Sequence, residues 1–105
     1  MKFVLPKMMR ERKCRSGVIN VSSIGGVMPH ACNAIYSGTK GFNDLFSRGL
    51  ALEVHEKVDM MCLRPGGVQS NITRIKPGSG IITARQCAKS TLNKLGHDFV
   101  TYGDW

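Results

Sequence analysis

The pattern of apolar and polar positions predicts helices and strands in alternation. Residues 2–12 carry apolar side chains at helical spacing, which predicts a first helix. Residues 17–23 are short and mostly β-branched, which predicts a strand. Its apolar residues do not alternate with polar ones, as is typical of a strand covered on both faces. Glycines and a proline predict a loop over residues 24–33.

The longest helical pattern runs over residues 34–57, and its apolar side chains spread over a wide face. Gly38, Gly41 and Gly49 each weaken this helix by up to ~1 kcal/mol relative to alanine. So many glycines in one helix indicate close approach to another backbone or to a ligand.

The end of the chain repeats the alternation. Residues 58–63 form a second apolar run, which stops at a proline–glycine segment, and residues 68–80 are polar and irregular. Thr83 and Gln86 form the sequence of a capping box. The helix that they begin ends at a glycine, and residues 99–102 predict a third strand. The expected inner face of this helix consists of Ala88, Thr91, Leu92 and Leu95.

This order of elements predicts an α/β fold with a doubly wound parallel sheet and right-handed crossovers. Three strands make a poor sheet, and burial on both of its faces needs helices on both sides, of which this chain has barely enough. The sequence therefore has the features of part of a domain.

Composition and length exclude several classes. The chain has 105 residues, 42% of them hydrophobic, and contains no run of the ~18 apolar residues that a transmembrane helix needs. No secretory signal peptide is recognisable. Cysteines at 14, 32, 62 and 87 form no close pair, and the histidines are scattered. We therefore expect free thiols and no metal site.

The net charge is +8, and six basic residues with one acid fall within residues 1–15. A basic segment can bind a phosphate polymer, anionic lipid or an anionic cofactor, although runs of charge usually face solvent. The aromatic residues that alternate with basic ones in single-strand binders are missing here. We expect no nucleic-acid partner.

Three features carry chemistry. Ser22 and Ser23 end the first strand, Tyr36 and Lys40 are one helical turn apart, and a proline–glycine pair ends the second strand. Ligands bind at the carboxyl ends of strands in such sheets. An ammonium within ~4–6 Å favours the phenolate form of a tyrosine, which can then exchange a proton as a general acid or base. A serine hydroxyl beside them can hold a carbonyl oxygen, so the set suits carbonyl reduction or alcohol oxidation with a hydride-carrying cofactor.

The joint spacing is more specific than any single motif. Asn20-Val21-Ser22-Ser23 is followed by Tyr36 thirteen residues after Ser23, then by Lys40, and by Pro65-Gly66 twenty-nine residues after Tyr36. This pattern resembles the short-chain dehydrogenase/reductase family over nearly the whole chain. The resemblance implies the C-terminal half of a Rossmann-like sheet and an NAD(P)-dependent oxidoreductase.

The resemblance also implies roles for individual residues. Tyr36 is the catalytic acid/base, Lys40 assists it and holds the nicotinamide ribose, and Ser23 orients the substrate oxygen. Asn20 stabilises the central sheet. Four further residues contribute to the nicotinamide pocket: Pro65, Gly66, Val68 and Ser70, the last standing where the family usually has threonine.

Within the family, Leu5-Pro6-x-Met8, Ile35-Tyr36-Ser37-x-Thr39-Lys40 and Lys76-Pro77 resemble the 17-beta-hydroxysteroid dehydrogenase and very-long-chain 3-oxoacyl-CoA reductase group. That group implies NADP or NAD with NADP favoured, and a lipid-like carbonyl or alcohol substrate such as a steroid or a 3-oxoacyl-CoA. It implies the endoplasmic reticulum, with the cytoplasm as the alternative. The helix over residues 34–57 is expected to form a homo-oligomer.

The glycine-rich Thr-Gly-x-x-x-Gly-x-Gly turn of the family does not occur in these residues. We therefore expect residues 1–105 to be an incomplete short-chain dehydrogenase domain without the N-terminal cofactor-binding strands. The alternative is a non-catalytic remnant that acts as a binding or interaction module. The mass of the native polypeptide distinguishes the two.

Overall fold

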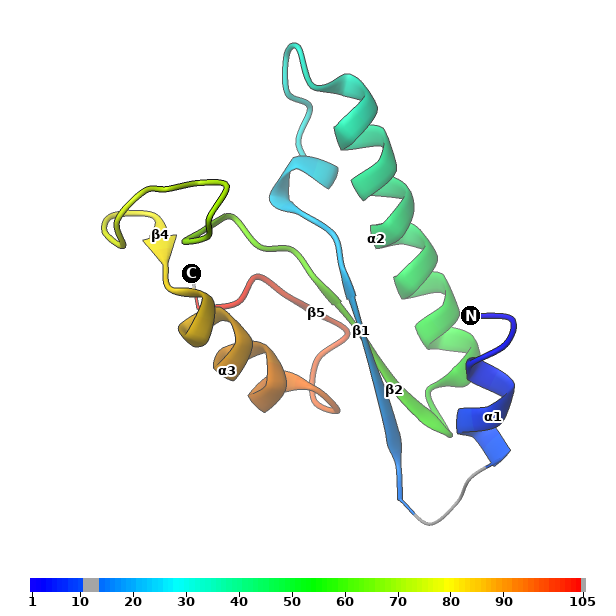
Figure 1. Cartoon of the computed structure of the whole chain (residues 1–105). Helices are drawn as coiled ribbons and strands as arrows, with labels where there is room; N and C mark the ends of the chain where they lie inside the picture. Colours follow the sequence, from blue (N-terminus) through cyan, green and yellow to red (C-terminus); the bar gives the residue numbers. More distant parts are fainter. Residues whose placement is uncertain (11–13, 105) are drawn as a thin grey trace.

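The computed structural model, which describes residues 1–10 and 14–104, confirms an α/β fold with a parallel sheet of three strands (Figure 1). The elements in chain order are α1 (Leu5–Arg10), β1 (Ser16–Val21), the 3-10 helix η1 (Ile24–Gly26), α2 (Ala34–Val54), β2 (Val58–Leu63), β3 (Gly67–Val68), β4 (Ile81–Ile82), α3 (Ala84–Lys94) and β5 (Val100–Thr101).

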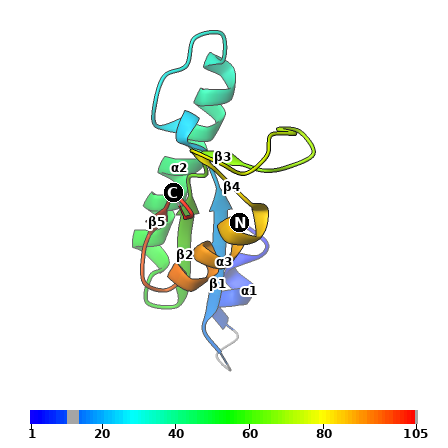
Figure 2. The same cartoon turned by 90° about the vertical axis from the view of Figure 1, so that its left-hand side faces the viewer.

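The sheet has the strand order β1-β2-β5, and both pairings are parallel. β1 and β2 pair along their whole length, from Ser16 opposite Val58 to Val21 opposite Leu63. Figures 1 and 2 show α1 and α2 on one face of the sheet and α3 on the other. The carboxyl ends of β1 and β2 therefore point toward the same end of the molecule, where η1 begins.

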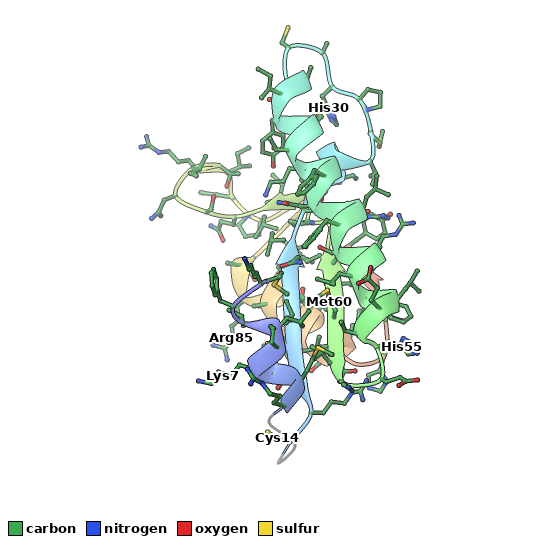
Figure 3. The ribbon with its side chains drawn as sticks, turned by 90° about the vertical axis from the view of Figure 1, so that its right-hand side faces the viewer. Lys7, Cys14, His30, His55, Met60 and Arg85 are labelled. Atoms are coloured by element: carbon green, nitrogen blue, oxygen red, sulfur yellow. The ribbon has the colours of Figure 1, made fainter. Side chains whose placement is uncertain are left out.

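The main core lies between the sheet and the two helices α1 and α2. Its buried members are Leu5, Ala51, Val54, Val58 and Met60. Figure 3 shows Met60 on β2 beneath these helices. On the opposite face, Leu95 packs across β1 at Gly17, where an added Cβ would lie 2.6 Å from the leucine Cδ2 atom. The backbone of β1 is thus accessible to side chains from both layers.

Several element ends differ from the sequence prediction. Helix α1 begins at Leu5 rather than residue 2, and its predicted end at residues 11–12 lies outside the described residues. β1 ends at Val21 because Ser23 turns away to cap η1. α2 ends at Val54 instead of residue 57, and the third strand is only Val100–Thr101.

One sequence prediction about burial is wrong and another is wrong in part. β1 is only half-buried, with Val21 50% exposed, because it lies at the edge of the sheet and not between two strands. For the inner face of α3 the prediction is confirmed at Thr91, which is buried, and at Leu95, which packs against Gly17, but it is wrong at Ala88 and Leu92, which are exposed. Cys87 and Ser90 are buried in their place. Small side chains on this face let α3 approach Gly103, where an added Cβ would lie 3.2 Å from the Cys87 sulfur.

The segment predicted as irregular over residues 68–80 is flanked by a second, two-stranded sheet. β3 pairs with β4 in parallel, with Gly67 opposite Ile81 and Val68 opposite Ile82. Between them, residues 69–80 form an exposed loop that projects from the same end of the molecule as η1 (Figures 1 and 2).

Helix α2 buries its polar and small side chains and exposes its large apolar ones. The buried residues are Asp44, Ser47, Ala51 and Val54. The exposed large apolar residues are Ile35, Phe42, Leu45, Phe46 and Leu52, and the rings of Phe42 and Phe46 stack with their centroids 5.7 Å apart. The wide apolar face predicted for this helix is therefore present, but it faces away from the sheet.

Candidate active site

The segments that follow β1 and β2 are joined by backbone hydrogen bonds. The Ser22 amide donates to Leu63 O at 2.7 Å, and the Ile24 amide donates to Pro65 O at 3.1 Å. Ser23 lies between these two bonds in the chain. The structure therefore brings Ser23 beside Pro65, one of the residues expected to line a nicotinamide pocket.

The two neighbouring serines have different surroundings. Ser22 is 1% exposed, and its hydroxyl donates to Lys40 O at 2.7 Å, which joins the end of β1 to α2. Ser23 is half-buried, and its Oγ accepts a hydrogen bond from the Gly25 amide at 3.1 Å. This bond leaves the Ser23 hydroxyl proton free to be donated to a ligand.

Glycines in η1 allow its backbone to lie against α2. A Cβ at Gly25 would lie 3.4 Å from Cε1 of Tyr36 and 3.5 Å from Oγ of Ser23, so the glycine is between the phenol ring and the hydroxyl. A Cβ at Gly26 would lie only 2.7 Å from the Lys40 carbonyl carbon. The close backbone approach predicted for the helix glycines is confirmed at Gly41, where an added Cβ would lie 3.2 Å from Gly26 O.

Tyr36 and Lys40 lie together on the first turns of α2. The Lys40 ammonium is 5.8 Å from the centroid of the Tyr36 ring, and it donates to Val21 O at 3.1 Å. Tyr36 is 42% exposed, so its phenol can be reached from outside the chain. A phenol, an ammonium and a serine hydroxyl thus gather at the carboxyl end of the sheet.

The remaining predicted pocket residues lie along the segment that follows β2. Pro65, Gly66 and Val68 are half-buried, and Val68 belongs to β3. Ser70 is exposed in a local turn, where its Oγ lies 3.2 Å from Oγ1 of Thr73. The structure therefore holds Pro65 against the serine segment, whereas Ser70 makes its described contacts within its own loop.

Asn20 joins the sheet to the helix. Its Nδ2 donates to Oγ of Ser47 at 2.8 Å, and the Ser47 hydroxyl donates to Asn43 O at 2.6 Å. The sheet-stabilising role expected for Asn20 thus takes the form of a bond from β1 to α2.

An ion pair that the sequence did not predict connects α2 to the end of β2. The guanidinium of Arg64 donates to both carboxylate oxygens of Asp44, at 2.5 Å from Nε and 2.8 Å from Nη2. The side chains are 3% exposed for Asp44 and 11% for Arg64. Arg64 also donates to the hydroxyl of Tyr102 at 2.8 Å, and Arg48 lies 3.4 Å from the same carboxylate.

The ion pair changes the acidity of its members. The hydrogen bonds from Arg64 hold the pKa of Asp44 below its ordinary value, and the carboxylate in turn raises the pKa of Arg64. Cys62, whose thiol donates to Asp44 at 3.6 Å, has its pKa raised to about 11 by burial and then by the negative carboxylate. The sequence signal for this ion pair was Asp44, which lies one helical turn after Lys40 on the side of the helix that carries Tyr36.

Other candidate features contribute little to this site. Cys14 and Cys32 are exposed, Cys62 and Cys87 are buried, and all four are free thiols. His30 and His55 lie at opposite ends of α2 in Figure 3. Within residues 1–10 and 14–104, no group of three metal-ligating side chains could hold an ion. In the same ranges, no helix is long and apolar enough to cross a membrane.

Comparison with known proteins finds related sequences. A family model described as short chain dehydrogenase matches residues 1–77. Very-long-chain 3-oxoacyl-CoA reductase-A of Danio rerio is 35% identical over 104 residues, which are 97% of this chain and 32% of that protein. The chain therefore spans about a third of the length of this curated relative.

Solved structures of dehydrogenases also match this chain. The structure of a 7beta-hydroxysteroid dehydrogenase matches 98% of this chain and 40% of its own, with a TM-score of 0.77 and 23% identity, which shows a shared fold. The closed form of a serine dehydrogenase complexed with NADP+ matches 66% of this chain and 27% of its own, with a TM-score of 0.58 and 31% identity.

Proposed function

Because the chain belongs to the short chain dehydrogenase family, we propose that it supplies the catalytic part of an NAD(P)-dependent oxidoreductase that interconverts a carbonyl and a secondary alcohol. The observation that carries this proposal is the meeting of Tyr36, Lys40 and Ser23 at the carboxyl end of β1. In this proposal residues 1–105 are part of a short-chain dehydrogenase domain.

The residues present fit the nicotinamide–ribose half of such a cofactor. Among the described residues, the Lys40 ammonium makes one hydrogen bond, so two of its three donors remain for ribose hydroxyls. Pro65, Gly66 and Val68 are half-buried on the segment after β2 and would line the nicotinamide. The Ser70 hydroxyl would have to exchange its Thr73 contact for the carboxamide. We propose NADP, with NAD as the alternative, because solved relatives hold either one: a serine dehydrogenase is complexed with NADP+ and a 3-oxoacyl-[acyl-carrier protein] reductase with NAD.

The chain's own residues account for the proton and for the orientation of the substrate. A bound nicotinamide supplies or accepts the hydride. Ser23 donates its free proton to the carbonyl oxygen and thereby orients it. Tyr36 donates the proton that neutralises the developing alkoxide, and the neighbouring Lys40 ammonium stabilises the phenolate that remains.

We propose a lipid-like substrate, with 3-oxoacyl-CoA or a steroid as the class. The relation to a very-long-chain 3-oxoacyl-CoA reductase supports this choice. Two apolar side chains in the loop over residues 69–80 also support it, since Ile72 is 94% and Ile75 55% exposed at the end of the molecule that carries the site (Figure 2). The same relation leads us to propose the endoplasmic reticulum as its location.

Substitutions at the three residues test the proposal in the native polypeptide that carries this chain. Turnover is measured as NADPH oxidation with a panel of 3-oxoacyl thioesters and ketosteroids. Tyr36→Phe removes the proton donor but keeps the ring, and we expect kcat to fall about 10²–10⁴-fold with the fold intact. Ser23→Ala should lower kcat with little change in cofactor affinity, because its partner is the substrate oxygen.

Lys40→Met should weaken both turnover and NADPH binding, since one charge serves both. Lys57→Met, an exposed lysine beyond the end of α2, is the matched control and should change neither. Near-normal turnover by Tyr36→Phe, or a Lys57→Met defect as large as that of Lys40→Met, would contradict the proposed roles.

A further inference from the structure

The Asp44–Arg64 pair lies where the parts of the site meet. Asp44 is on the stripe of α2 that carries Tyr36 and Lys40, one turn beyond the lysine. Arg64 is the residue before Pro65, at the end of β2. The bidentate bond between the two side chains therefore connects the helix that holds the phenol to the turn expected to hold the nicotinamide.

The backbone around Arg64 also connects this turn to the segment that carries Ser23. The carbonyls of its two neighbours, Leu63 and Pro65, accept the amides of Ser22 and Ile24, which flank Ser23. The Arg64 amide itself donates to Thr101 O at 2.7 Å, and its side chain donates to Tyr102. Arg64 thus contacts the tyrosine helix and β5, and its two neighbours in the chain contact the serine segment.

We propose that Asp44 and Arg64 are positioning residues, whose ion pair fixes the Tyr36–Lys40 helix relative to Ser23 and the Pro65–Gly66 turn. The pair is nearly dry and bidentate, so it fixes both the distance and the orientation of the two backbones. Misplacement by about 1 Å is sufficient to lower turnover about 100-fold in a preorganised site. The kinetic part of this inference rests on the proposed function.

A second ion pair in the chain, more exposed at 48% for Arg15 and 25% for Asp59, provides a control at the other end of the sheet. Arg15 donates to Asp59 at 2.7 Å and also to the carbonyls of His55 and Glu56, so it joins the starts of β1 and β2. These positions are at the opposite end of the strands from Ser23 and Pro65. A purely stabilising ion pair should behave in the same way at either end.

The test uses the native polypeptide that carries this chain and compares Asp44→Leu/Arg64→Met with Asp59→Leu/Arg15→Met. Each double variant removes both members of an ion pair, and Arg48, which loses its contact with Asp44, is 47% exposed to solvent, so the melting temperature should stay close to that of the parent. The milder variants Asp44→Asn and Tyr102→Phe are measured beside them. Two readouts are taken on folded protein: kcat at saturating NADPH and substrate, and the side-chain ¹³C resonance of labelled Tyr36, assigned by its loss in Tyr36→Phe.

We expect the Asp44/Arg64 variant to lose about 10–100-fold in kcat and to shift the Tyr36 resonance, while the Asp59/Arg15 variant changes neither. An unmoved Tyr36 resonance overturns the positioning role, whatever the rate. A shifted resonance with parental kcat overturns its importance for turnover. If the parent reduces no carbonyl, the proposed function fails by itself, and the resonance alone decides whether the pair positions Tyr36. If the double variant does not fold, the resonance in Asp44→Asn and Tyr102→Phe decides in the same way.

Discussion

Replacing Gly26 by alanine should push η1 and α2 apart. The new Cβ would lie 2.7 Å from the carbonyl carbon of Lys40 and 2.9 Å from the amide nitrogen of Gly41. Two carbon atoms without a bond between them are favourable only at about 3.5 Å or more, so the backbones must separate by roughly 0.8 Å. Because both contacts are backbone atoms, no side chain can rotate away to relieve them.

The cost can be estimated from similar cases. Overpacking of this kind costs about 1–3 kcal/mol, against which the stiffer unfolded chain returns about 0.4–1 kcal/mol. We therefore expect Gly26→Ala to lower the free energy of unfolding by roughly 1–2 kcal/mol. If Lys40 serves the cofactor, kcat should fall as well, by about tenfold, because the displaced backbone carries this lysine.

Glycines within α2 provide the controls. An alanine Cβ would meet nothing within 4 Å at Gly38 or Gly49, so each substitution there should stabilise the helix by about 0.5–1 kcal/mol. Urea unfolding followed by circular dichroism measures all three variants, with unchanged m-values as the check that the unfolding transition is the same. Should Gly26→Ala prove as stable as Gly38→Ala, the close contact between η1 and α2 would be wrong.

Two further predictions concern α3 and α2. Thr83→Ala removes the acceptor of the Gln86 amide at 3.1 Å, and we expect it to lower the free energy of unfolding, measured with urea, by about 1 kcal/mol. Thr39→Ala, at an exposed threonine of α2, is the control and should lower it less. Equal losses of stability in the two variants would argue against the capping box. We propose that the exposed apolar face of α2 is the contact between copies in a homo-oligomer. Phe42→Glu should therefore reduce the mass measured by sedimentation equilibrium, and Glu53→Gln should leave it unchanged. An unchanged mass for Phe42→Glu would exclude this face as the contact.

Local signals predicted the elements well because each depends on residues close in sequence. The capping box is present as predicted, with the Thr83 amide donating to Oε1 of Gln86 at 2.9 Å. The glycine that ends this helix, Gly96, has a φ of +87°, which favours glycine. Such bonds form within a few residues, so the sequence alone contains them.

Burial was harder to predict because it depends on the partner of each face. A period of 3.6 allows α3 to bury either Ala88 and Leu92 or Cys87 and Ser90, and apolarity favoured the first pair. The structure buries the second pair, with Cys87 against Gly103, where an added Cβ would lie 3.2 Å from its sulfur. Similarly, three of the four buried residues of α2, Asp44, Ser47 and Ala51, are small or polar, which no hydrophobic pattern indicates.

The parts of the candidate site that lie on a single helix or at the end of a single strand could be predicted from the sequence. A spacing of four placed Tyr36 and Lys40 together, and the end of a strand placed Ser23 near them. The Asp44–Arg64 pair was not predicted, because its members are twenty residues apart on different elements and no local rule connects them. Its detection requires the parallel pairing of β1 with β2 and the placement of α2 over them.

The buried thiol of Cys62 should make the fold sensitive to alkaline pH. Its pKa in the folded chain is about 11, above the ordinary value of 9.0, because it is fully buried and faces the Asp44 carboxylate. The folded chain therefore holds this proton more firmly than the unfolded chain. A stabilising contribution of roughly 2–3 kcal/mol is complete below pH 9 and is lost as the pH rises through 11.

Urea unfolding at intervals from pH 8 to 11 isolates this contribution when the parent is compared with Cys62→Ala. The alanine variant has a cavity whose cost does not depend on pH, so the difference in stability between the two proteins should shrink as the pH rises from 9 to 11. Cys14→Ala, at an exposed thiol, is the matched control and should follow the parent at every pH. Parallel curves for the parent and Cys62→Ala across this range would show that the fold does not hold the thiol protonated, and the burial of Cys62 beside Asp44 would then be wrong.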